Sequence, residues 1–373
     1  MKLKIAFVYD STYPYFIGGA EIRNYQLARQ LSSLGHSVHL FGAKMWDGQD
    51  VMEKDGLTYH GVCDYGSFKG VRSVWQPLGF SLRLLFALRK ERYDLIDCSA
   101  FPYLPAYSCR AAASLWDVPL ILTWNQYWGR YWIRYKGLVI GGTGMVLEYF
   151  ARHLTSHHVA VSRKVKDALG VKDAEVIGNG VDIQSCNEAQ ESREKSDIIF
   201  VGRLSHGKNV DVLLRAVSLI PDKPKTMIVG DGPMMGELQR LARSLGLEDA
   251  VRFAGETGHE KIFSYLKASK VFAFPSTNEG FGIAAAEAKA AGLVLVVAKD
   301  SASAASELVD DGVDGFLVGC EAGEFADALG RLLADERLRT AMSERGKSAA
   351  LRLTWGAQAK RLEEYYLRVL AGD

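Results

Sequence analysis

The sequence lacks the features of several protein classes. Its 373 residues hold few cysteines, odd in number and without CxxC spacing: Cys63, Cys98, Cys109, Cys186 and Cys320. This pattern argues against a disulfide framework or a zinc knuckle and favours a reducing cytoplasm. The charge is balanced, with 45 Lys and Arg against 44 Asp and Glu, so we expect no nucleic-acid partner.

No apolar run reaches the roughly 18 to 20 residues that a membrane span requires. The N-terminal stretch MKLKIAFVYD ends its short apolar run at Asp10 and has no small-residue cleavage site. We interpret it as a strand and not as a signal peptide. The expected location is the cytoplasm, including the inner face of the membrane.

Short apolar runs alternate with helical stretches along the whole chain, which is typical of parallel sheets with crossover helices. In the first helical stretch, Ile22, Leu27, Leu31 and Leu34 are expected to face inward and Gly35 to end the helix. The chain is too long for one ordinary core. We predict an α/β fold of two Rossmann-like doubly wound domains that face each other across a cleft.

The predicted domains are residues 1–181 and 197–353, joined by a polar linker at 182–196 that has no periodicity. The last helix, 354–371, is amphipathic, and packing back on the first domain is its expected role.

A glycine pair, Gly18 and Gly19, lies between the first strand and the first helix, at the edge where doubly wound sheets bind ligands. A tight turn that needs glycine torsions explains the pair equally well. The GxGxxG motif is missing, and the second strand ends at Lys44 without an acidic residue. A NAD-dependent oxidoreductase is therefore a poor hypothesis.

A basic loop follows a later strand, with Arg203 at the strand end and Lys208 just before a helix. Two cations at a helix start can hold a phosphate, although either alone is explained as a solvated basic residue. Gly230 and Gly232 form a turn at the same sheet edge.

The stretch NEGFGIAAAEAKAAG, residues 278–292, combines a helix start, expected near Gly282, with two acids. Glu287 lies about one and a half turns inside the helix and could accept hydrogen bonds from a ribose, whereas Glu279 lies outside it. Alone, each acid is explained as a surface carboxylate. Backbone N–H groups that can face an oxyanion are those of Gly280, Phe281, Gly282 and Ile283.

Together these residues resemble the retaining glycosyltransferases of family 4, which have the GT-B architecture. The motifs GGAE, IGNGVD, FVGRLSHGKN, VGDGP, VRFAGE, PSTNEGFGIAAAEAKAAG and DGVDGFLV carry the resemblance over nearly the whole chain. It implies an acceptor-binding first domain and a donor-binding second domain. The implied donor-binding residues are Gly18, Gly19, Gly202, Arg203, Lys208, Gly230, Gly232, Arg252, Phe253, Glu279, Gly280, Phe281, Gly282, Ile283 and Glu287.

The resemblance assigns the donor diphosphate to Arg203 and Lys208, the ribose to Glu287 and the surroundings of the transferred sugar to Glu279. A leaving diphosphate needs fixed positive groups or a metal. No DxD pair ends a strand, and the acids of VDDGVDG (309–315) are interpreted as a turn. We therefore predict transfer of a hexose-type unit from a nucleoside diphosphate sugar, without a metal or another cofactor.

The sequence departs from the family at Asn125, where a histidine near the sugar is common, and at Ser301–Ser306, which replaces a double-glycine loop. Asparagine can form hydrogen bonds but cannot act as a base. We place Asn125 in the predicted catalytic set with Glu279, Arg203 and Lys208. A different donor sugar, a histidine from elsewhere and weakened activity are the three explanations, so a catalytically silent nucleotide-sugar-binding protein is the alternative hypothesis.

Two stretches of the first domain, 67–94 and 123–137, mix aromatic residues with Arg and Lys. This composition suits a membrane surface or a carbohydrate platform, and a core helix also explains residues 78–90. Our hypothesis is a peripheral membrane contact that serves a glycan or lipid-linked acceptor.

Overall fold

The computed structural model describes residues 1–64 and 75–372 and divides the chain into two compact units, each built on one sheet. The first unit is Met1–Asn179 with Trp355–Asp373, and the second is Gly180–Thr354. The first eight residues of the aromatic stretch 67–94 lie outside the described residues.

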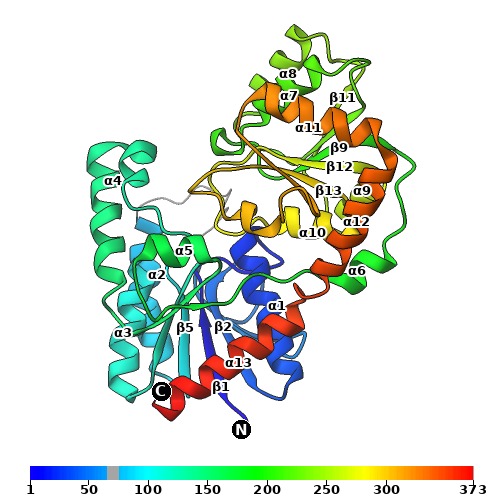
Figure 1. Cartoon of the computed structure of the whole chain (residues 1–373). Helices are drawn as coiled ribbons and strands as arrows, with labels where there is room; N and C mark the ends of the chain where they lie inside the picture. The colour runs from blue at the N-terminus through cyan, green and yellow to red at the C-terminus, as the bar shows by residue number, and fades with distance from the viewer. Residues whose placement is uncertain (65–74, 373) are drawn as a thin grey trace. The chain divides into compact units, whose positions relative to one another are not determined.

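The first sheet has the strand order β3-β4-β2-β1-β5-β6-β7-β8, and its neighbouring strands are parallel except for the pair β3 and β4. Helix α1 covers one face together with α13, while α2 and α3 cover the other (Figure 1). The strands are β1 (Lys4–Val8), β2 (Ser37–Lys44), β3 (Val51–Lys54), β4 (Leu57–Asp64), β5 (Leu95–Ser99), β6 (Leu120–Trp124), β7 (His157–Ala160) and β8 (Glu175–Val176). The helices are α1 (Gly19–Ser33), α2 (Trp75–Leu88), α3 (Leu104–Trp116), α4 (Tyr131–Ala151), α5 (Arg163–Leu169) and α13 (Trp355–Ala371).

The first helix follows most of its predicted pattern. Leu27 and Leu31 of α1 are buried against the sheet and α13, and Gly35, with a φ of 97°, stands just beyond the end of the helix. Leu34 was expected to face inward, but it is 42% exposed. Leu34 is the C-cap residue, and its N–H still donates to the Gln30 carbonyl at 3.1 Å. The helix ends at this residue, so the 3.6-residue period is a poor guide to the direction of its side chain.

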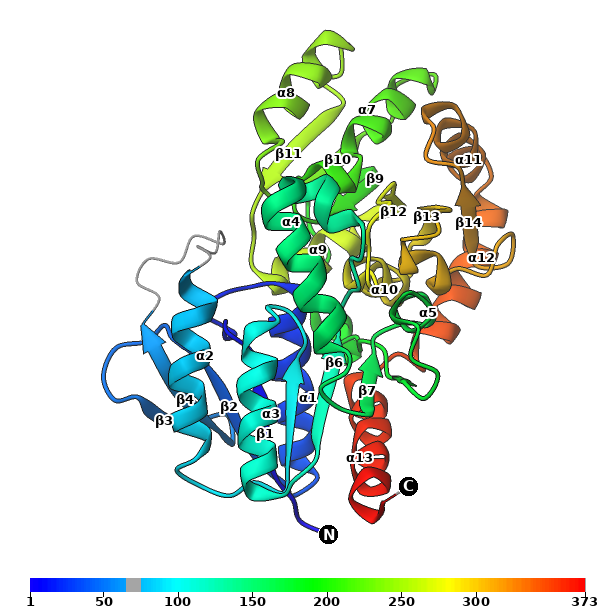
Figure 2. The same ribbon diagram turned by 90° about the vertical axis from the view of Figure 1, so that its left-hand side faces the viewer.

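The second sheet is parallel throughout, in the order β11-β10-β9-β12-β13-β14. Helix α7 packs with α8 and α11, and α10 packs with α6, α9 and α12 (Figure 2). The strands are β9 (Ser196–Val201), β10 (Thr226–Val229), β11 (Val251–Gly255), β12 (Ser269–Phe274), β13 (Val294–Ala298) and β14 (Gly315–Val318). The helices are α6 (Ile183–Glu188), η1 (His206–Lys208), α7 (Val210–Leu219), α8 (Met235–Ser244), α9 (His259–Lys267), α10 (Ile283–Ala291), η2 (Ala304–Leu308), α11 (Ala322–Ala334) and α12 (Glu336–Ala350).

The segment 182–196, expected to be a linker, differs from that expectation. It lies within the second unit and forms α6, with Asp182 accepting a hydrogen bond from the Ser185 N–H at 2.9 Å as the N-cap. Cys186 is buried in the core of this unit. Six helical residues with one buried side chain are too few to produce a periodic pattern in the sequence.

Both sheets reverse their strand order at one point, between β1 and β5 in the first unit and between β9 and β12 in the second. In doubly wound sheets, ligands bind at the carboxyl ends of the strands beside such a reversal. The loop after β9 carries Arg203 and Lys208, and the loop after β12 carries Glu279. The topology therefore brings residues far apart in the sequence to one sheet edge. Among the described residues, no helix combines the length and hydropathy that crossing a bilayer requires.

Candidate functional site

The loops after β9 and β12 meet through an ion pair. The Lys208 Nζ donates a hydrogen bond to the Glu279 Oε1, and the same oxygen accepts one from the Ser276 hydroxyl at 3.1 Å. The Lys208 ammonium also lies 5.7 Å from the centre of the Phe274 ring. The predicted phosphate-binding cation and the predicted sugar-binding acid are therefore direct partners.

Asn209 fixes these two loops to each other, although the sequence analysis did not select it. It has the left-handed conformation, with a φ of 48°, and its Nδ2 donates to the Pro275 carbonyl at 3.0 Å and to the Thr277 hydroxyl at 2.9 Å. The Thr277 N–H donates in turn to the Gly207 carbonyl at 3.1 Å. The signal was present in the motif HGKN, since asparagine tolerates this conformation better than other residues with a side chain.

The turn after β10 packs against the loop after β9, which carries Arg203 and Lys208. Gly230 has a φ of 130°, and a side chain there would collide with the Gly202 carbonyl oxygen; one at Gly232 would collide with the Leu204 carbonyl oxygen. The Leu204 N–H donates to the Asp231 carbonyl at 2.9 Å. These glycines therefore permit a close approach of two backbones, which positions the loop that carries Arg203.

Arg203 itself is exposed, and its guanidinium forms no hydrogen bond or ion pair within residues 1–64 and 75–372. Its guanidinium can accordingly meet an anion without first breaking a bond in the protein. Arg252, expected among the donor-binding residues, is exposed and pairs with Glu194 at 2.8 Å, while the neighbouring Phe253 packs against the core.

Helix α10 begins where the sequence predicted. Gly282 is its N-cap, with a φ of 93°, and no side chain caps the helix there. The first N–H groups of a helix lack partners within it, so those of Ile283 and its neighbours are available to an anion. Gly280 and Phe281 form the partly exposed turn that leads into this helix start.

Glu287 is buried within α10, although a single acid in a helix is more often exposed to solvent. It is 5% exposed, and its Oε1 lies 2.6 Å from the His259 Nε2. His259 begins α9 and was not selected from the sequence. Burial by itself lowers the pKa of His259, but the hydrogen bond with Glu287 and the charge of that carboxylate outweigh burial and raise the pKa above its usual value.

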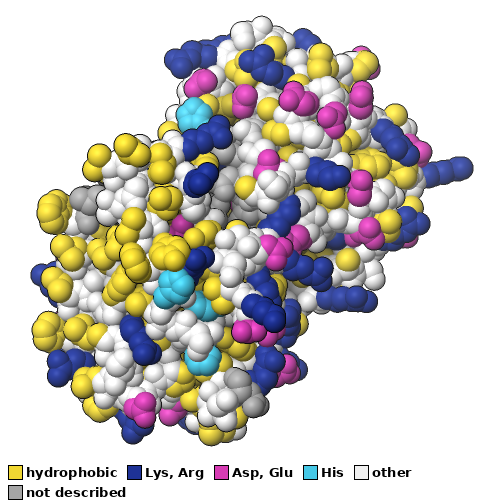
Figure 3. Space-filling view, turned by 60° about the vertical axis from the view of Figure 1, so that its left-hand side comes forward, with side chains coloured by type: hydrophobic (Ala, Val, Ile, Leu, Met, Phe, Trp, Pro, Cys, Tyr) yellow, Lys and Arg dark blue, Asp and Glu magenta, His cyan; other side chains and the backbone are white. Residues whose placement is uncertain are grey.

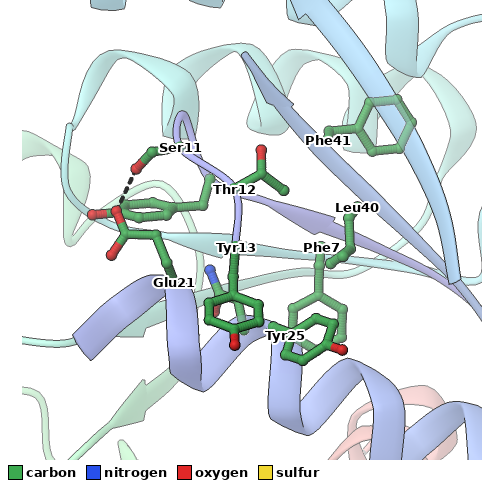
Figure 4. A pocket seen from close by; sticks show the side chains of 10 residues that line it. Phe7, Ser11, Thr12, Tyr13, Glu21, Tyr25, Leu40 and Phe41 are labelled. Atoms are coloured by element: carbon green, nitrogen blue, oxygen red, sulfur yellow. Dashed lines mark hydrogen bonds between the residues drawn. The ribbon is translucent and has the colours of Figure 1, made fainter. Parts of the chain in front are cut away.

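In the first unit the glycine pair stands at the start of α1. Gly18 is extended, with a φ of −153°, so the turn needs no glycine torsion there; a side chain would instead meet the carboxylate of Glu21. Figure 4 shows Glu21 accepting a hydrogen bond from Ser11, beside a small cavity next to Tyr13 and Tyr25. This carboxylate lies at the carboxyl end of β1, beside the reversal of strand order.

Asn125 follows β6 in the first unit, and a buried acid holds the loop behind it. The fully buried Glu148 accepts hydrogen bonds from the N–H groups of Trp128 at 2.8 Å and Gly129 at 2.6 Å, and from the Tyr103 hydroxyl. Burial raises the pKa of Glu148 despite these donors. The sequence contains a signal for this residue, since it is the single acid in the otherwise apolar stretch MVLEYF.

Two family models match this chain, one over each half. The model described as Glycosyltransferase Family 4 matches residues 17–185, and the one described as Glycosyl transferases group 1 matches residues 184–349. The chain is 32% identical over 391 residues to a protein of Xylanimonas cellulosilytica named D-inositol 3-phosphate glycosyltransferase, with 94% of this chain and 91% of the relative covered.

Solved structures share the fold. Sucrose-phosphate synthase from Thermosynechococcus elongatus matches with a TM-score of 0.84 at 20% identity, and each chain is covered completely. The Anabaena protein HepE in complex with UDP and glucose matches with a TM-score of 0.77 at 21% identity, with 97% of this chain and 98% of the other covered.

Proposed function

This chain belongs to the group 1 glycosyltransferases of the GT-B fold, and from that premise we propose that it is a retaining enzyme that needs no metal ion. It transfers a sugar from a nucleoside diphosphate sugar to a hydroxyl group of a glycan or a lipid-linked glycan. The observation that carries the proposal is the Lys208–Glu279 pair beside the start of α10.

Cleavage of the bond between sugar and diphosphate leaves negative charge on the diphosphate. Arg203, Lys208 and the open start of α10 supply fixed positive groups at the sheet edge where that charge develops, in the role that a metal plays elsewhere. When a diphosphate binds the Lys208 ammonium, the ion pair with Glu279 is broken. The Glu279 carboxylate can then accept hydrogen bonds from the hydroxyl groups of the sugar. Donor binding and placement of the acid are thus linked.

The nucleotide base and the acceptor are suggested by relatives. HepE was solved with UDP and glucose, which makes UDP-glucose the first donor to be tested. The name of the Xylanimonas relative adds D-inositol 3-phosphate to the acceptors worth testing. The relatives are named as transferases, so they do not favour the silent binding protein as the alternative. Asn125 fits an enzyme whose sugar is oriented by a hydrogen bond and not by a base.

We expect a nucleoside diphosphate alone to stabilise the protein in the presence of EDTA. A ligand at about 100 times its Kd adds about 2.7 kcal/mol, which corresponds to a rise in Tm of roughly 5 to 10 °C for a unit of this size. A thermal-shift screen of UDP, GDP, ADP and dTDP measures this, with inorganic phosphate as the control. An unchanged Tm with all four nucleotides contradicts donor binding, and a shift that appears only with magnesium contradicts the metal-free mechanism.

The proposed membrane contact rests on an exposed apolar stripe along α2. Trp75, Leu78, Leu82 and Phe86 are exposed at helical spacing, whereas the opposite side of the helix is buried. Helix α4, which packs against α3, adds exposed apolar residues at 138–140, and Figure 3 shows hydrophobic side chains gathered on this unit. Exposed Arg and Lys at 83, 89 and 90 provide the positive charge that an anionic lipid surface attracts.

We expect the protein to bind vesicles that contain phosphatidylglycerol and to release them as salt is raised, because salt screens the basic residues. Leu82→Glu should weaken this binding about tenfold, since it removes apolar area and places an acid at the lipid surface. Leu219→Glu on α7 is the matched control, because Leu219 and Leu82 are both 61% exposed. Equal vesicle binding by the two variants in a flotation assay contradicts the contact through α2.

A further inference from the structure

Glu287 is held by a side chain outside the predicted site. His259 of α9 and Glu287 of α10 lie 28 positions apart in the sequence, and a distance of 2.6 Å joins the Nε2 and the Oε1. The edge of the His259 ring meets the Phe263 ring at a centroid distance of 5.2 Å and an interplanar angle of 77°. The imidazole is therefore oriented from two sides, and it orients the carboxylate in turn.

The charges around the imidazole favour its protonated form. Three acids face it: Glu287 from α10, Asp182 from the start of α6, and Glu260 from α9 itself. The N-terminus of α9 opposes a positive charge at its first residue, so the pairing must overcome the helix dipole. The neighbouring Cys186 thiol has a pKa raised by burial and adds no charge near neutral pH.

The pair leaves part of the carboxylate unused. Within the part of the chain that the structure describes, the Glu287 carboxylate forms no hydrogen bond except the one with His259. A carboxylate has two oxygens and about four acceptor positions. One oxygen is therefore fixed by the imidazole, and the other can accept a hydrogen bond from a hydroxyl group.

We propose that His259 is a positioning residue for the donor ribose: it orients the Glu287 carboxylate so that its second oxygen accepts hydrogen bonds from the ribose hydroxyl groups. The inference rests on the proposed function, because it presumes a nucleoside diphosphate sugar as the donor. It adds a residue of α9 to the site and makes recognition of the ribose depend on a titratable side chain.

The sign of the pH dependence follows from the raised pKa of His259. The imidazole stays protonated at higher pH than an ordinary histidine, so the charge-assisted pairing is complete below the usual histidine range. The pairing weakens as the pH rises through the raised pKa. Affinity for the nucleotide should fall on the alkaline side, and this loss should require His259.

Two variants separate the charge from the hydrogen bond. His259→Phe keeps an aromatic ring against Phe263 and removes the donor, while His259→Gln keeps an N–H donor without the charge. For UDP, GDP and ADP, calorimetry should show a Kd about tenfold higher for His259→Phe, since a charge-assisted hydrogen bond is lost. His259→Gln should stay within about threefold, and both variants should lose the alkaline change in affinity.

The ribose is tested with the 2′,3′-dideoxy form of each nucleotide. The Kd of these forms should be equal for the wild type and His259→Phe, because they lack the hydroxyl groups that donate hydrogen bonds to Glu287. A loss of affinity of the same size for ordinary and dideoxy nucleotides would mean a purely structural role and would overturn the proposal. So would an unchanged Kd and pH profile in His259→Phe.

An NMR titration of the imidazole tests the pair without any ligand. The pKa of His259 should be raised in the wild type and should fall in Glu287→Gln. If the pair titrates in this way but none of the nucleotides binds, the proposed function fails and the inference with it. If the nucleotides bind but His259 titrates as an ordinary histidine in both proteins, only the inference fails.

Discussion

Arg203→Ala and Lys208→Ala are each expected to lower kcat/KM by about 10²- to 10³-fold, the cost of removing one fixed group that stabilises developing negative charge. The exposed Arg203 guanidinium can hold two oxygens of the diphosphate at once. Lys208→Ala has a second effect, because it leaves the partly buried Glu279 carboxylate without its cation beside an incoming anion. Initial rates of sugar transfer, or of donor hydrolysis, measure both losses.

Arg215→Ala is the matched control, since Arg215 is an exposed arginine on α7 of the same unit. It should retain the wild-type rate. The nucleotide-induced rise in Tm should also disappear in Arg203→Ala while the Tm of the free protein is unchanged. Activity within a few-fold of wild type in both Arg203→Ala and Lys208→Ala would remove the electrostatic basis of the proposed mechanism.

Lys289→Met should destabilise the second unit by about 3 to 5 kcal/mol, the usual cost of removing one partner of a buried ion pair. Lys289 and Asp314 are 4% and 5% exposed, and 2.6 Å separates the Nζ from the Oδ2. The ammonium also donates to the Leu308 carbonyl, at the end of η2. Urea unfolding of the second unit, followed by a probe confined to it, measures the loss.

The double variant Lys289→Met with Asp314→Asn is the control for this prediction. It removes both charges and keeps an oxygen for the Asp310 N–H, which donates to the Asp314 Oδ1 at 2.9 Å. We expect it to be more stable than the single variant, because no unpaired charge remains buried. The prediction is wrong if the free energy of unfolding of Lys289→Met lies within about 1 kcal/mol of the wild-type value. Burial of an unpaired Asp314 carboxylate costs more than that, so this carboxylate would then have gained water or another partner.

Lys289 also helps to position the backbone of Glu279 in the candidate site. It joins α10 to η2, and the Ala304 N–H of η2 donates to the Glu279 carbonyl at 2.8 Å. The backbone of Glu279 is thus tied to a segment that the buried lysine holds in place. The acids of VDDGVDG form a turn, as expected from the sequence, but Asp314 is a buried partner of Lys289 and is not a surface residue.

An anion site with two acids is explained by the cations that accompany them. Glu279 is paired with Lys208, and Glu287 is paired with His259. Lys208 gives Glu279 a positive partner, and the raised pKa of His259 favours the protonated form that gives Glu287 one. A carboxylate paired in this way does not repel a diphosphate with its full charge. The two pairs differ in one respect, because the diphosphate competes for Lys208, whereas His259 lies on the side proposed for the ribose.

Much of the fold could be predicted from the sequence, because strand and helix signals act over a few residues. The continuous apolar run of β13 is buried at every position, as expected for a strand covered on both faces. Gly282 begins α10 as predicted. The short helix α6 was missed, and Gly230 and Gly232 prove to serve the packing of two loops rather than a turn alone.

The sequence by itself determined the two α/β domains, the loops at the strand ends and the residue types that suit a diphosphate and a ribose, since periodicity, glycine torsions and helix starts are local properties. Only the tertiary structure decided which side chains are partners. Lys208 and Glu279 are 71 positions apart, and the pair forms because β9 and β12 are neighbours in the sheet. The partnership of His259 and Glu287 likewise follows from the tertiary structure, because α9 and α10 pack against each other. Glu287 is buried, and a buried carboxylate without a partner is costly.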